Sequence, residues 1–472
     1  MRVAAEGTER YDAIIVGAGP AGIFAALELA GESDLDILLV EKGCALHERR
    51  CPSRESGRCV HCRPCDITCG WGGAGAFSDG KLTLSPEVGG WLGEYVGVER
   101  LKEAILVVDR VWRDFGAPDI LHGADPDKVA SWRVRALRQR LRLVDSPIRH
   151  MGTERCVEVL EAMRLALDGR VHILTDTPVT SIVVTDGAAG GQVAGVVTAD
   201  GSRFESPVVI LAPGREGAAW LQAEAEQLGL SVTTNAVDIG VRVEVPAVVT
   251  DEITDDLYEP KLLYTTSRFE DPVRTFCMNP CGEVSKENYG DVVTVNGHSW
   301  GEGGPKTLST NFALLVSTRF THPFKDPIAY GKSIARLANL LGEDIIVQRL
   351  TDLQAGRRTT KERLARCSVP PTMAGSTPGD LSFVLPYRHL QDIIDMLEAM
   401  DGLLPGVAGR DTLLYGVEVK FYSSRLELDE GLQTKVRGLY AVGDGAGVTR
   451  GLVQASASGL VAARAVLLGA AT

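Results

Sequence analysis

Short apolar runs bounded by glycine or charged residues recur along the chain and predict buried parallel strands. The runs lie at residues 11–16, 36–40, 171–174, 179–184, 207–212 and 438–443. Helix-like segments follow the first run at 23–30 and the last run at 451–459. Strands alternating with helices are typical of an α/β fold with a parallel sheet. Because the runs come from both ends and from the middle of the sequence, we expect one domain assembled from discontinuous segments.

The region after residue 235 has a different pattern, which mixes strand-like segments with amphipathic helices. Residues 241–245 and 291–295 read as strands, and residues 328–341 as an amphipathic helix. We therefore expect a second, α+β domain inserted into the first. The predicted division is 1–50, 141–235 and 407–472 for the first domain, 51–140 for a cysteine-rich loop with a helical insert, and 236–406 for the inserted domain.

Length and charge narrow the classes of function. The 472 residues suffice for two or three packed domains. The formal net charge of −13 argues against a nucleic-acid partner, which would require a basic face. No run of about 18 apolar residues stands out, and the first ten residues are polar, so we expect a cytoplasmic protein without a membrane partner. Abundant Ala and an excess of Arg over Lys are typical of a high-GC bacterial genome.

The turn after the first predicted strand has the spacing of a dinucleotide-binding motif. Residues 17–22 read GAGPAG, a G-x-G-x-x-G pattern between a strand and a helix. Gly17 allows the tight turn, Gly19 lets the backbone approach a pyrophosphate, and Gly22 lets the helix pack on the strand. Glu41, at the end of the second strand, is expected to accept hydrogen bonds from a ribose. The remaining candidate binding residues here are Pro20, Ala21 and Lys42.

The same spacing recurs at residues 70–75 (GWGGAG). No apolar strand precedes this copy and no second strand ending in an acid follows it. It therefore does not predict a second nucleotide-binding fold.

The far end of the sequence distinguishes FAD from NAD(P). Residues 438–447 (GLYAVGDGAG) run as a strand into a Gly-rich turn, and a helix rich in small residues follows. This segment resembles the C-terminal FAD motif of the glutathione-reductase-like flavoprotein superfamily. The resemblance implies a Rossmann-type FAD-binding domain, with Gly443 and Asp444 at the ribityl chain. It also implies that Gly451, Leu452 and Val453 present backbone donors near the flavin ring.

Two further segments fit this superfamily. The strand at 207–212 ends in Ala212-Pro213-Gly214, and the superfamily places such a turn near FAD, which makes Ala212 and Gly214 candidate binding residues. The backbone of the residue matching Val179 usually meets the adenine. The resemblance also implies that the inserted domain covers the flavin and shapes the substrate pocket.

Residues 71–82 (WGGAGAFSDGKL) look like the signature of a family of uncharacterised FAD-dependent dehydrogenases within that superfamily. Further matches lie at 238–242, 275–278, 295–299, 310–314 and 443–447. A Gly-rich loop lets backbone amides lie against the isoalloxazine ring, so Gly73, Ala74 and Gly75 are candidate cofactor contacts. Ser78, Asp79 and Lys81 on the same loop are candidates for proton transfer. The alternative is an ordinary Ser-Asp-Gly turn with solvated ends.

Five cysteines lie close together in the sequence. Their spacing from Cys51 to Cys69 is C-x7-C-x2-C-x2-C-x3-C, and the last four match a bacterial ferredoxin pattern. We favour Cys51, Cys59, Cys62 and Cys65 as ligands of a [4Fe–4S] cluster, because Cys69 opens directly into the flavin loop. Structural zinc and a redox disulfide or free thiols are the alternatives.

The inserted domain offers weaker candidates for chemistry. His298 is the candidate catalytic residue there, and Cys277, Cys281 and Tyr422 are others, although a packed core role suits each of them better than catalysis. Residues 354–358 (QAGRR) fit an acidic substrate, an NADPH phosphate or a solvated turn. Two functions follow: an FAD-dependent oxidoreductase acting on a small organic substrate, or a flavoprotein relaying single electrons from a protein partner. The expected electron source is ferredoxin or NAD(P)H.

Overall fold

The computed structural model of the protein describes residues 3–4, 8–52, 60, 62–185, 191–289, 291–300, 304–318 and 326–470. The chain divides into two compact units, each described here by itself. Unit 1 comprises Met1–Asp119, Arg149–Asn235 and Ser423–Thr472, and unit 2 comprises Ile120–Ile148 and Ala236–Tyr422. Cys59 lies outside the described residues.

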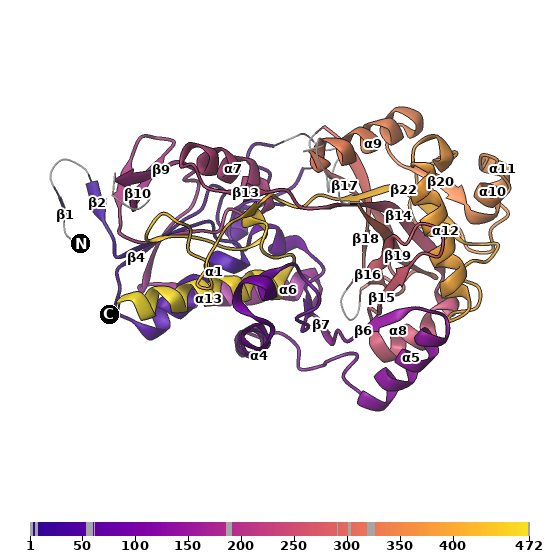
Figure 1. The fold of residues 1–472 in the computed structure, drawn as a ribbon, viewed down its shortest axis with the longest axis horizontal. Helices are drawn as coiled ribbons and strands as arrows, with labels where there is room; N and C mark the ends of the chain where they lie inside the picture. The colour runs from indigo at the N-terminus through magenta and orange to yellow at the C-terminus, as the bar shows by residue number, and fades with distance from the viewer. Residues whose placement is uncertain are drawn as a thin grey trace. The chain divides into compact units, whose positions relative to one another are not determined.

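Unit 1 is built on a five-stranded parallel sheet whose strands come from all three chain segments of the unit, and Figure 1 labels its strand β4. Its order is β24 (Leu439–Ala441), β12 (Val209–Leu211), β3 (Ala13–Val16), β4 (Ile37–Val40) and β8 (Val171–Leu174). The central strands β3, β4 and β12 are buried throughout, which explains why their sequences are continuous apolar runs rather than alternating ones. The predicted Rossmann-type α/β fold, assembled from discontinuous segments, is confirmed.

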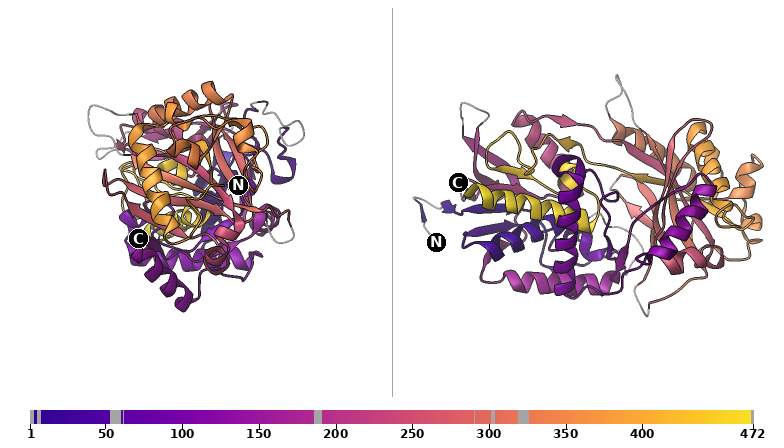
Figure 2. Two further views of the ribbon diagram at one scale, coloured as in Figure 1. Left: turned by 90° about the vertical axis from the view of Figure 1, so that its right-hand side faces the viewer. Right: turned by 60° about the horizontal axis from the view of Figure 1, so that its bottom comes forward.

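Two long helices of unit 1 pack against each other through small residues. Helix α1 (Pro20–Glu32) and helix α13 (Leu452–Ala470) lie side by side, as Figures 1 and 2 show. A Cβ added at Gly459 would come within 1.9 Å of the Ala21 carbonyl oxygen, so glycine allows this close approach. The N- and C-terminal parts of unit 1 are therefore joined by direct backbone packing as well as by the sheet.

Helix α13 is apolar along most of its length, although no run of about 18 apolar residues stood out in the sequence. Its residues Leu452–Gly469 are long and apolar enough to cross a membrane by length and composition, but 72% of this window is buried inside the protein. An apolar helix buried to this extent is typical of the core of a globular domain. The composition follows from its contacts with α1 and α4 (Val98–Asp114).

A second sheet of unit 1 has the order β1 (Val3–Ala4), β2 (Thr8–Arg10), β11 (Arg203–Glu205), β10 (Gln192–Thr198) and β9 (Val179–Thr185). A hairpin turn lies at Asp200-Gly201 between β10 and β11, with Gly201 at φ +86° and a hydrogen bond of 3.0 Å from Thr198 N to Ser202 O. The other elements are η1 (Leu46–Glu48), η2 (Gly73–Phe77), β5 (Lys81–Thr83), α3 (Leu92–Val96), α6 (Gly152–Leu167), η3 (Arg215–Gly217), α7 (Ala218–Gln227), β13 (Val232–Thr233), β23 (Arg425–Leu426) and η6 (Asp444–Ala446). Strand β7 (Ile148–His150) lies where the chain passes between the units.

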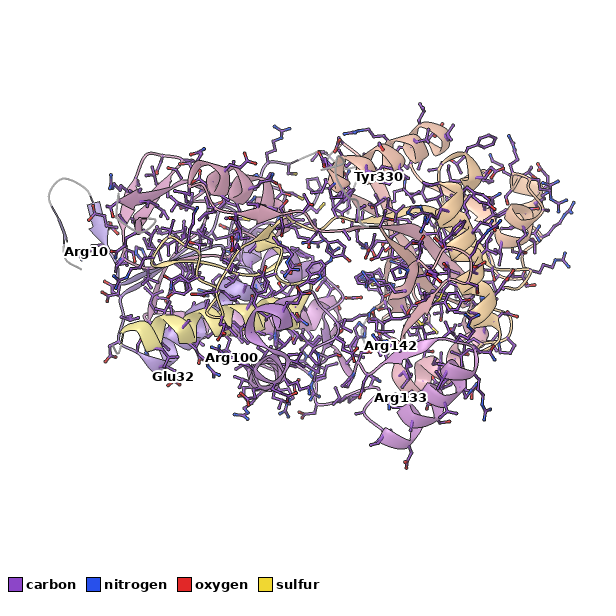
Figure 3. The ribbon with its side chains drawn as sticks, in the orientation of Figure 1. Arg10, Glu32, Arg100, Arg133, Arg142 and Tyr330 are labelled. Atoms are coloured by element: carbon purple, nitrogen blue, oxygen red, sulfur yellow. The ribbon has the colours of Figure 1, made fainter. Side chains whose placement is uncertain are left out.

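Unit 2 contains an eight-stranded, mainly antiparallel sheet. Its order is β21 (Thr377–Pro378), β20 (Ile346–Arg349), β22 (Leu413–Lys420), β14 (Val237–Pro246), β19 (Ser309–Thr318), β16 (Pro272–Asn279), β15 (Lys261–Thr265) and β6 (Arg142–Val144). Helices α9 (Pro327–Gly342) and α12 (Tyr387–Asp401) pack on it, and Figure 3 labels Tyr330 on α9 and Arg142 on β6. The remaining elements are α5 (Pro126–Arg138), η4 (Ala247–Val249), α8 (Asp251–Leu257), the hairpin β17 (Glu283–Asn288) and β18 (Val293–His298), α10 (Leu350–Gln354), α11 (Lys361–Leu364) and η5 (Leu381–Phe383).

The units differ from the predicted division at several places. Residues 51–119 belong to unit 1, and strand β6, expected in the first domain, lies in unit 2. Helix α5 lies in unit 2, where its Trp132 belongs to the apolar core, rather than in a separate insert at 51–140. Strand β22 was expected in the FAD-binding domain but pairs with β14 and β20 of unit 2. An apolar strand has the same pattern in either sheet, so its partners could not be identified from the sequence.

The packing of α13 on α1 makes a first prediction. The substitution Gly459→Ala should lower the free energy of unfolding by about 1–3 kcal/mol, because its methyl group would overlap the α1 backbone. Gly31→Ala is the matched control in α1, where a Cβ meets nothing within 4 Å, and should raise stability by about 0.5–1 kcal/mol. Chemical denaturation measures both. Equal changes in the free energy of unfolding for the two substitutions would show that the close contact between Gly459 and the α1 backbone does not matter for stability.

Candidate functional site

The carboxyl ends of the parallel strands bring the predicted binding segments of unit 1 together. Gly17 follows β3, and a Cβ there would lie 2.2 Å from the carbonyl oxygen of Ala212, which follows β12. Ala212 N also donates to Val16 O at 2.8 Å. Gly443 follows β24, and its Cβ would lie 3.2 Å from that of Ala21. Parallel strands of such a fold present their ligand site at this edge.

The glycines of these segments fall into two groups. Added Cβ atoms at Gly17 and Gly22 would collide with backbone, so these glycines serve internal packing. Added Cβ atoms at Gly19, Gly214 and Gly451 would meet nothing within 4 Å. These three come from three distant parts of the chain, and each exposes backbone beside open space. They are the positions at which a ligand could approach the main chain most closely.

The start of helix α1 carries a partial positive charge. The N–H groups of Ala21 and Gly22 precede the first helical bond, from Ile23 N to Gly19 O at 2.9 Å. No side chain caps this end, and no acidic residue lies in the first turn. Pro20, at the first helical position, has no N–H to satisfy. A phosphate is the ligand that such an end stabilises best.

Glu41 joins three separate turns. Its carboxylate accepts backbone N–H bonds from Ala18 at 2.8 Å and from Gly43 and Gly70, both at 2.9 Å. Its side chain is buried, with 6% exposure for the residue. A carboxylate accepts about four hydrogen bonds, so one position remains for the predicted ribose contact. The structure therefore assigns Glu41 an organising role that the sequence did not reveal, while the ribose contact stays a prediction.

Backbone hydrogen bonds join the segment just before β9 to Glu41 and Gly43. Asp176 N donates to Gly43 O and Thr177 N to Glu41 O, each at 2.9 Å. Val179 begins β9 two residues later, and Lys42 lies within the paired segment. The predicted roles of Val179 and Lys42 in binding adenosine remain predictions, but both residues lie next to the Glu41 turns.

Asp444 lies at the start of η6 with its carboxylate held from two sides. Thr449 Oγ1 donates to Oδ1 at 2.9 Å, and Gly451 N donates to Oδ2 at 3.4 Å. Burial raises the pKa of Asp444, and Arg215, 4.0 Å away, opposes this shift only in part. Gly443 N donates to Ser458 Oγ at 3.0 Å, which anchors the turn to α13. The side chain is 19% exposed, so it can still accept a ligand hydroxyl.

The Gly-rich loop lies against the starts of both helices. Gly72 N donates to Ala18 O at 2.8 Å, and a Cβ at Gly73 would lie 3.1 Å from Gly19 Cα. A Cβ at Gly75 would lie 2.8 Å from a methyl carbon of Leu452. The predicted set Gly73, Ala74, Gly75, Leu452 and Val453 thus lies at one place in unit 1. The segment forms η2, which confirms that this second G-x-G-x-x-G copy is not a nucleotide fold.

Arg49 holds this loop, and nothing in the sequence pattern indicated it. Its guanidinium donates to the carbonyl oxygens of Asp66, Ile67, Trp71 and Gly73 at 2.6–3.0 Å. It also lies 4.7 Å from the centre of the Phe77 ring, and the residue is only 5% exposed. Bonds from one guanidinium to four carbonyls fix the loop backbone without any ligand. Buried arginines have no sequence signature, so only the fold could reveal this role.

Three of the four candidate catalytic residues, Ser78, Asp79 and Lys81, lie on the Gly-rich loop of unit 1, and His298 lies in unit 2. Ser78 Oγ donates to Gly75 O at 2.8 Å and accepts from Gly80 N at 3.2 Å, so it closes the turn that the alternative interpretation expected. Asp79 and Lys81 form an ion pair at 3.0 Å with side chains 17% and 8% exposed. His298 lies in unit 2 on β18, with its ring edge-on to Trp300. The catalytic roles of all four remain predictions.

The cysteine hypothesis receives no support from the described residues. Among them, no group of three His, Cys, Asp or Glu side chains could hold a metal ion, and this search includes Cys51, Cys62 and Cys65. The fourth predicted ligand, Cys59, lies outside the described residues. Cys69 is 2% exposed, and burial raises the pKa of its thiol. The proposed set of four ligands therefore stays a prediction.

Comparison with known proteins supports a flavoprotein. Residues 236–421 match the family model "FAD-dependent protein, C-terminal domain-like". A protein of Clostridium beijerinckii described as uncharacterized is 25% identical over 488 aligned positions, covering 98% of this chain and 82% of that protein. The expected relation to FAD-dependent proteins is supported, whereas the glutathione-reductase-like subfamily is not distinguished.

Solved flavoenzymes resemble the chain at low identity. E. coli quinol fumarate reductase is 14% identical with a TM-score of 0.44, covering 99% of this chain and 71% of that one. The 3-ketosteroid-Δ4-(5α)-dehydrogenase of Rhodococcus jostii RHA1 is 13% identical with a TM-score of 0.45, covering 98% of both chains. Because both scores lie below 0.5, we base the functional proposal on the residues of this chain and on the family match.

The Arg49 contacts make a second prediction. Arg49→Lys keeps the charge but cannot reach four carbonyls, so backbone amides in residues 66–77 should exchange with deuterium at least about tenfold faster. Peptides from β14 in unit 2 should exchange as in the wild type. Unchanged protection of residues 66–77 would show that the loop is held by other contacts.

Proposed function

We propose that the protein is an FAD-dependent oxidoreductase. The observation that carries this proposal is the set of three glycines, Gly19, Gly214 and Gly451, which expose backbone beside open space at the ends of a parallel sheet. Only a ligand with several separated polar groups would use all three positions. FAD has a pyrophosphate, a ribityl chain and a flavin ring, which correspond to the three segments. The family match over 236–421 supports the same cofactor.

The residues present fit this cofactor by their chemistry. The unblocked start of α1 would hold the pyrophosphate, and the remaining acceptor position of Glu41 would hold a ribose hydroxyl. Asp444 would accept from a ribityl hydroxyl, and the first residues of α13 would face the flavin ring. Arg49 keeps the Gly-rich loop in one conformation, so the flavin ring would meet a surface that is already ordered.

Bound FAD supplies a flavin that exchanges hydride or single electrons with a small organic substrate. The Asp79–Lys81 pair could move a proton on the Gly-rich loop, because the two groups are paired and largely shielded from solvent. Ser78 would position the loop rather than transfer protons, since its hydroxyl already donates to Gly75 O.

Gly19→Ala tests the proposal. The added methyl group meets no protein atom within 4 Å and Gly19 has φ −77°, so the fold should tolerate it. The same methyl group would occupy the space where the pyrophosphate approaches the backbone. We expect the Kd for FAD to rise at least about tenfold, equivalent to about 1.4 kcal/mol.

Titration of the apoprotein with FAD, followed by flavin fluorescence, measures this change. Gly31→Ala in the same helix is the control and should bind FAD like the wild type. Thermal unfolding of the apoproteins should show no loss of stability for Gly19→Ala. Unchanged FAD affinity in that variant, or a wild type that binds no FAD, would contradict the proposal.

The cysteine-rich segment supports a second proposal, which concerns the electron source. We propose that Cys51, Cys59, Cys62 and Cys65 bind a [4Fe–4S] cluster that accepts single electrons from a protein donor such as ferredoxin. Its support is the ligand spacing, together with the greater exposure of Cys51, Cys62 and Cys65 than of the buried Cys69. NAD(P)H as direct reductant, and zinc as the bound metal, are the alternatives.

Metal analysis tests this second proposal. Protein prepared without oxygen should contain about four irons per chain, and Cys62→Ser should remove them while FAD stays bound. Cys367→Ser, in unit 2, is the control and should keep the iron. One zinc and no iron, or no metal at all, would rule out the cluster.

A further inference from the structure

The eight-stranded sheet of unit 2 has one apolar and one charged face. Along β14, Ile239, Val241 and Val243 belong to the apolar core. Asp238 and Arg242 alternate with them and therefore lie on the opposite face. The charged face continues on the neighbouring strands through Arg274 of β16, Glu418 and Lys420 of β22, and Lys261 of β15. Such a face needs polar partners, and most of its charges have them within the protein.

Most of these cations are fully engaged. Arg242, with no exposed side-chain surface, pairs with Glu418 at 2.9 Å. Lys420 is 2% exposed and lies 2.9 Å from Glu287 and 3.1 Å from Glu418. Lys261 is 10% exposed and is paired with Glu259. These groups balance one another, so they leave little charge for a ligand.

Arg274 differs from the other cations in exposure and in its unused donors. Its side chain is 27% exposed. One nitrogen, Nη2, donates to Asp238 Oδ2 at 2.5 Å and to Tyr422 Oη at 2.6 Å. A guanidinium has five N–H groups, so three of them, on Nε and Nη1, have no hydrogen-bond partner among the described residues.

The groups behind Arg274 hold it in place. Asp238 is 2% exposed, and its carboxylate also accepts from Tyr422 Oη at 2.6 Å and from Ser317 Oγ. Burial alone would raise the pKa of Asp238, but Arg274 outweighs this effect and the pKa is lowered. The pair with Asp238 and Tyr422 in turn raises the pKa of Arg274. The guanidinium therefore stays charged, and its position is fixed before any ligand binds.

An aromatic ring lies next to these donors. Arg274 Cζ is 4.8 Å from the centre of the Phe276 ring, and Lys261 Nζ and Lys420 Nζ are 5.3 and 5.9 Å from it. Phe276 is two residues from Arg274 on the same face of β16 and is partly exposed. An anion bound at Arg274 would therefore have the apolar surface of Phe276 beside it.

We propose that Arg274 binds the carboxylate of a small organic acid in unit 2. The free N–H groups on Nε and Nη1 point to different sides of the guanidinium, so each can donate a single hydrogen bond to a carboxylate oxygen, and Phe276 offers apolar contact to the body of the acid. Asp238 and Tyr422 act as positioning residues for the guanidinium. The binding of an acid depends on unit 2 alone. Its identification as the substrate class of the oxidoreductase rests on the function proposed above.

Calorimetric titration of the full chain with benzoate tests the proposal. We expect millimolar binding of benzoate and at least about tenfold weaker binding of benzamide, which has the same shape without the charge. Inorganic phosphate should bind more weakly than benzoate. Arg274→Lys, which keeps a charge beside Asp238 but lacks the free Nε and Nη1 donors, should weaken benzoate binding about tenfold.

Arg274→Gln leaves Asp238 buried without its partner, so the variant Arg274→Gln with Asp238→Asn removes both charges together. It should lose benzoate binding while its unfolding temperature shows that it is folded. Arg268→Gln is the matched control, because Arg268 also lies near an aromatic ring, 5.5 Å from Phe269, and should not change the affinity.

Three outcomes would overturn the proposal: no benzoate binding by the wild type, equal binding of benzamide, or full binding by the double variant. FAD content is measured on the same samples. If the protein contains FAD but does not bind benzoate, only the proposed acid-binding site is contradicted. Protein that binds benzoate but no FAD contradicts only the oxidoreductase.

Discussion

The carboxylate of Glu41 is the contact on which the candidate site of unit 1 most depends. It accepts backbone N–H groups from the turn after β3, from its own turn after β4, and from the start of the Gly-rich loop. Three segments without regular secondary structure are thereby fixed to one buried anion. A buried carboxylate is costly unless its oxygens are satisfied, so the turns and the acid stabilise one another. The positions of Gly19 and Gly73, which lie against each other, follow from this arrangement.

Much of unit 1 could be predicted from the sequence because its signals are local. Continuous apolar runs and glycines at fixed spacing identify buried strands and close backbone contacts within a few residues. The role of Arg49 could not be predicted, since its four carbonyl partners depend on how residues 66–73 fold back. The pairing of β22 with β14 and β20 could not be predicted either, because an apolar strand has the same sequence pattern in the sheet of unit 1 and in that of unit 2. Helix α13 was expected as a helix, and its contacts with α1 and α4 explain why its composition matches that of a membrane span.

The two units use buried charge differently. In unit 1, buried Glu41 and Arg49 bind backbone groups and hold loops. In unit 2, buried charges bind one another across neighbouring strands, as Arg242 and Glu418 do. Ion pairs of this kind contribute little net stability compared with apolar packing, but removal of one partner is strongly destabilising. The charged face of unit 2 is therefore better explained by the need to hold Arg274 and its neighbours in fixed positions than by a gain in stability.

The strand order of unit 1 has a consequence for biosynthesis. Strand β12 remains at the edge of an incomplete sheet until β24 has been made, and α1 lacks its packing partner until α13 follows. Both late elements come from Ser423–Thr472, after nearly all of unit 2 has left the ribosome. Unit 2 can thus complete its sheet before unit 1, which closes only once β24 and α13 have been made. Until then the apolar strand edge of unit 1 is a target for chaperones or for aggregation.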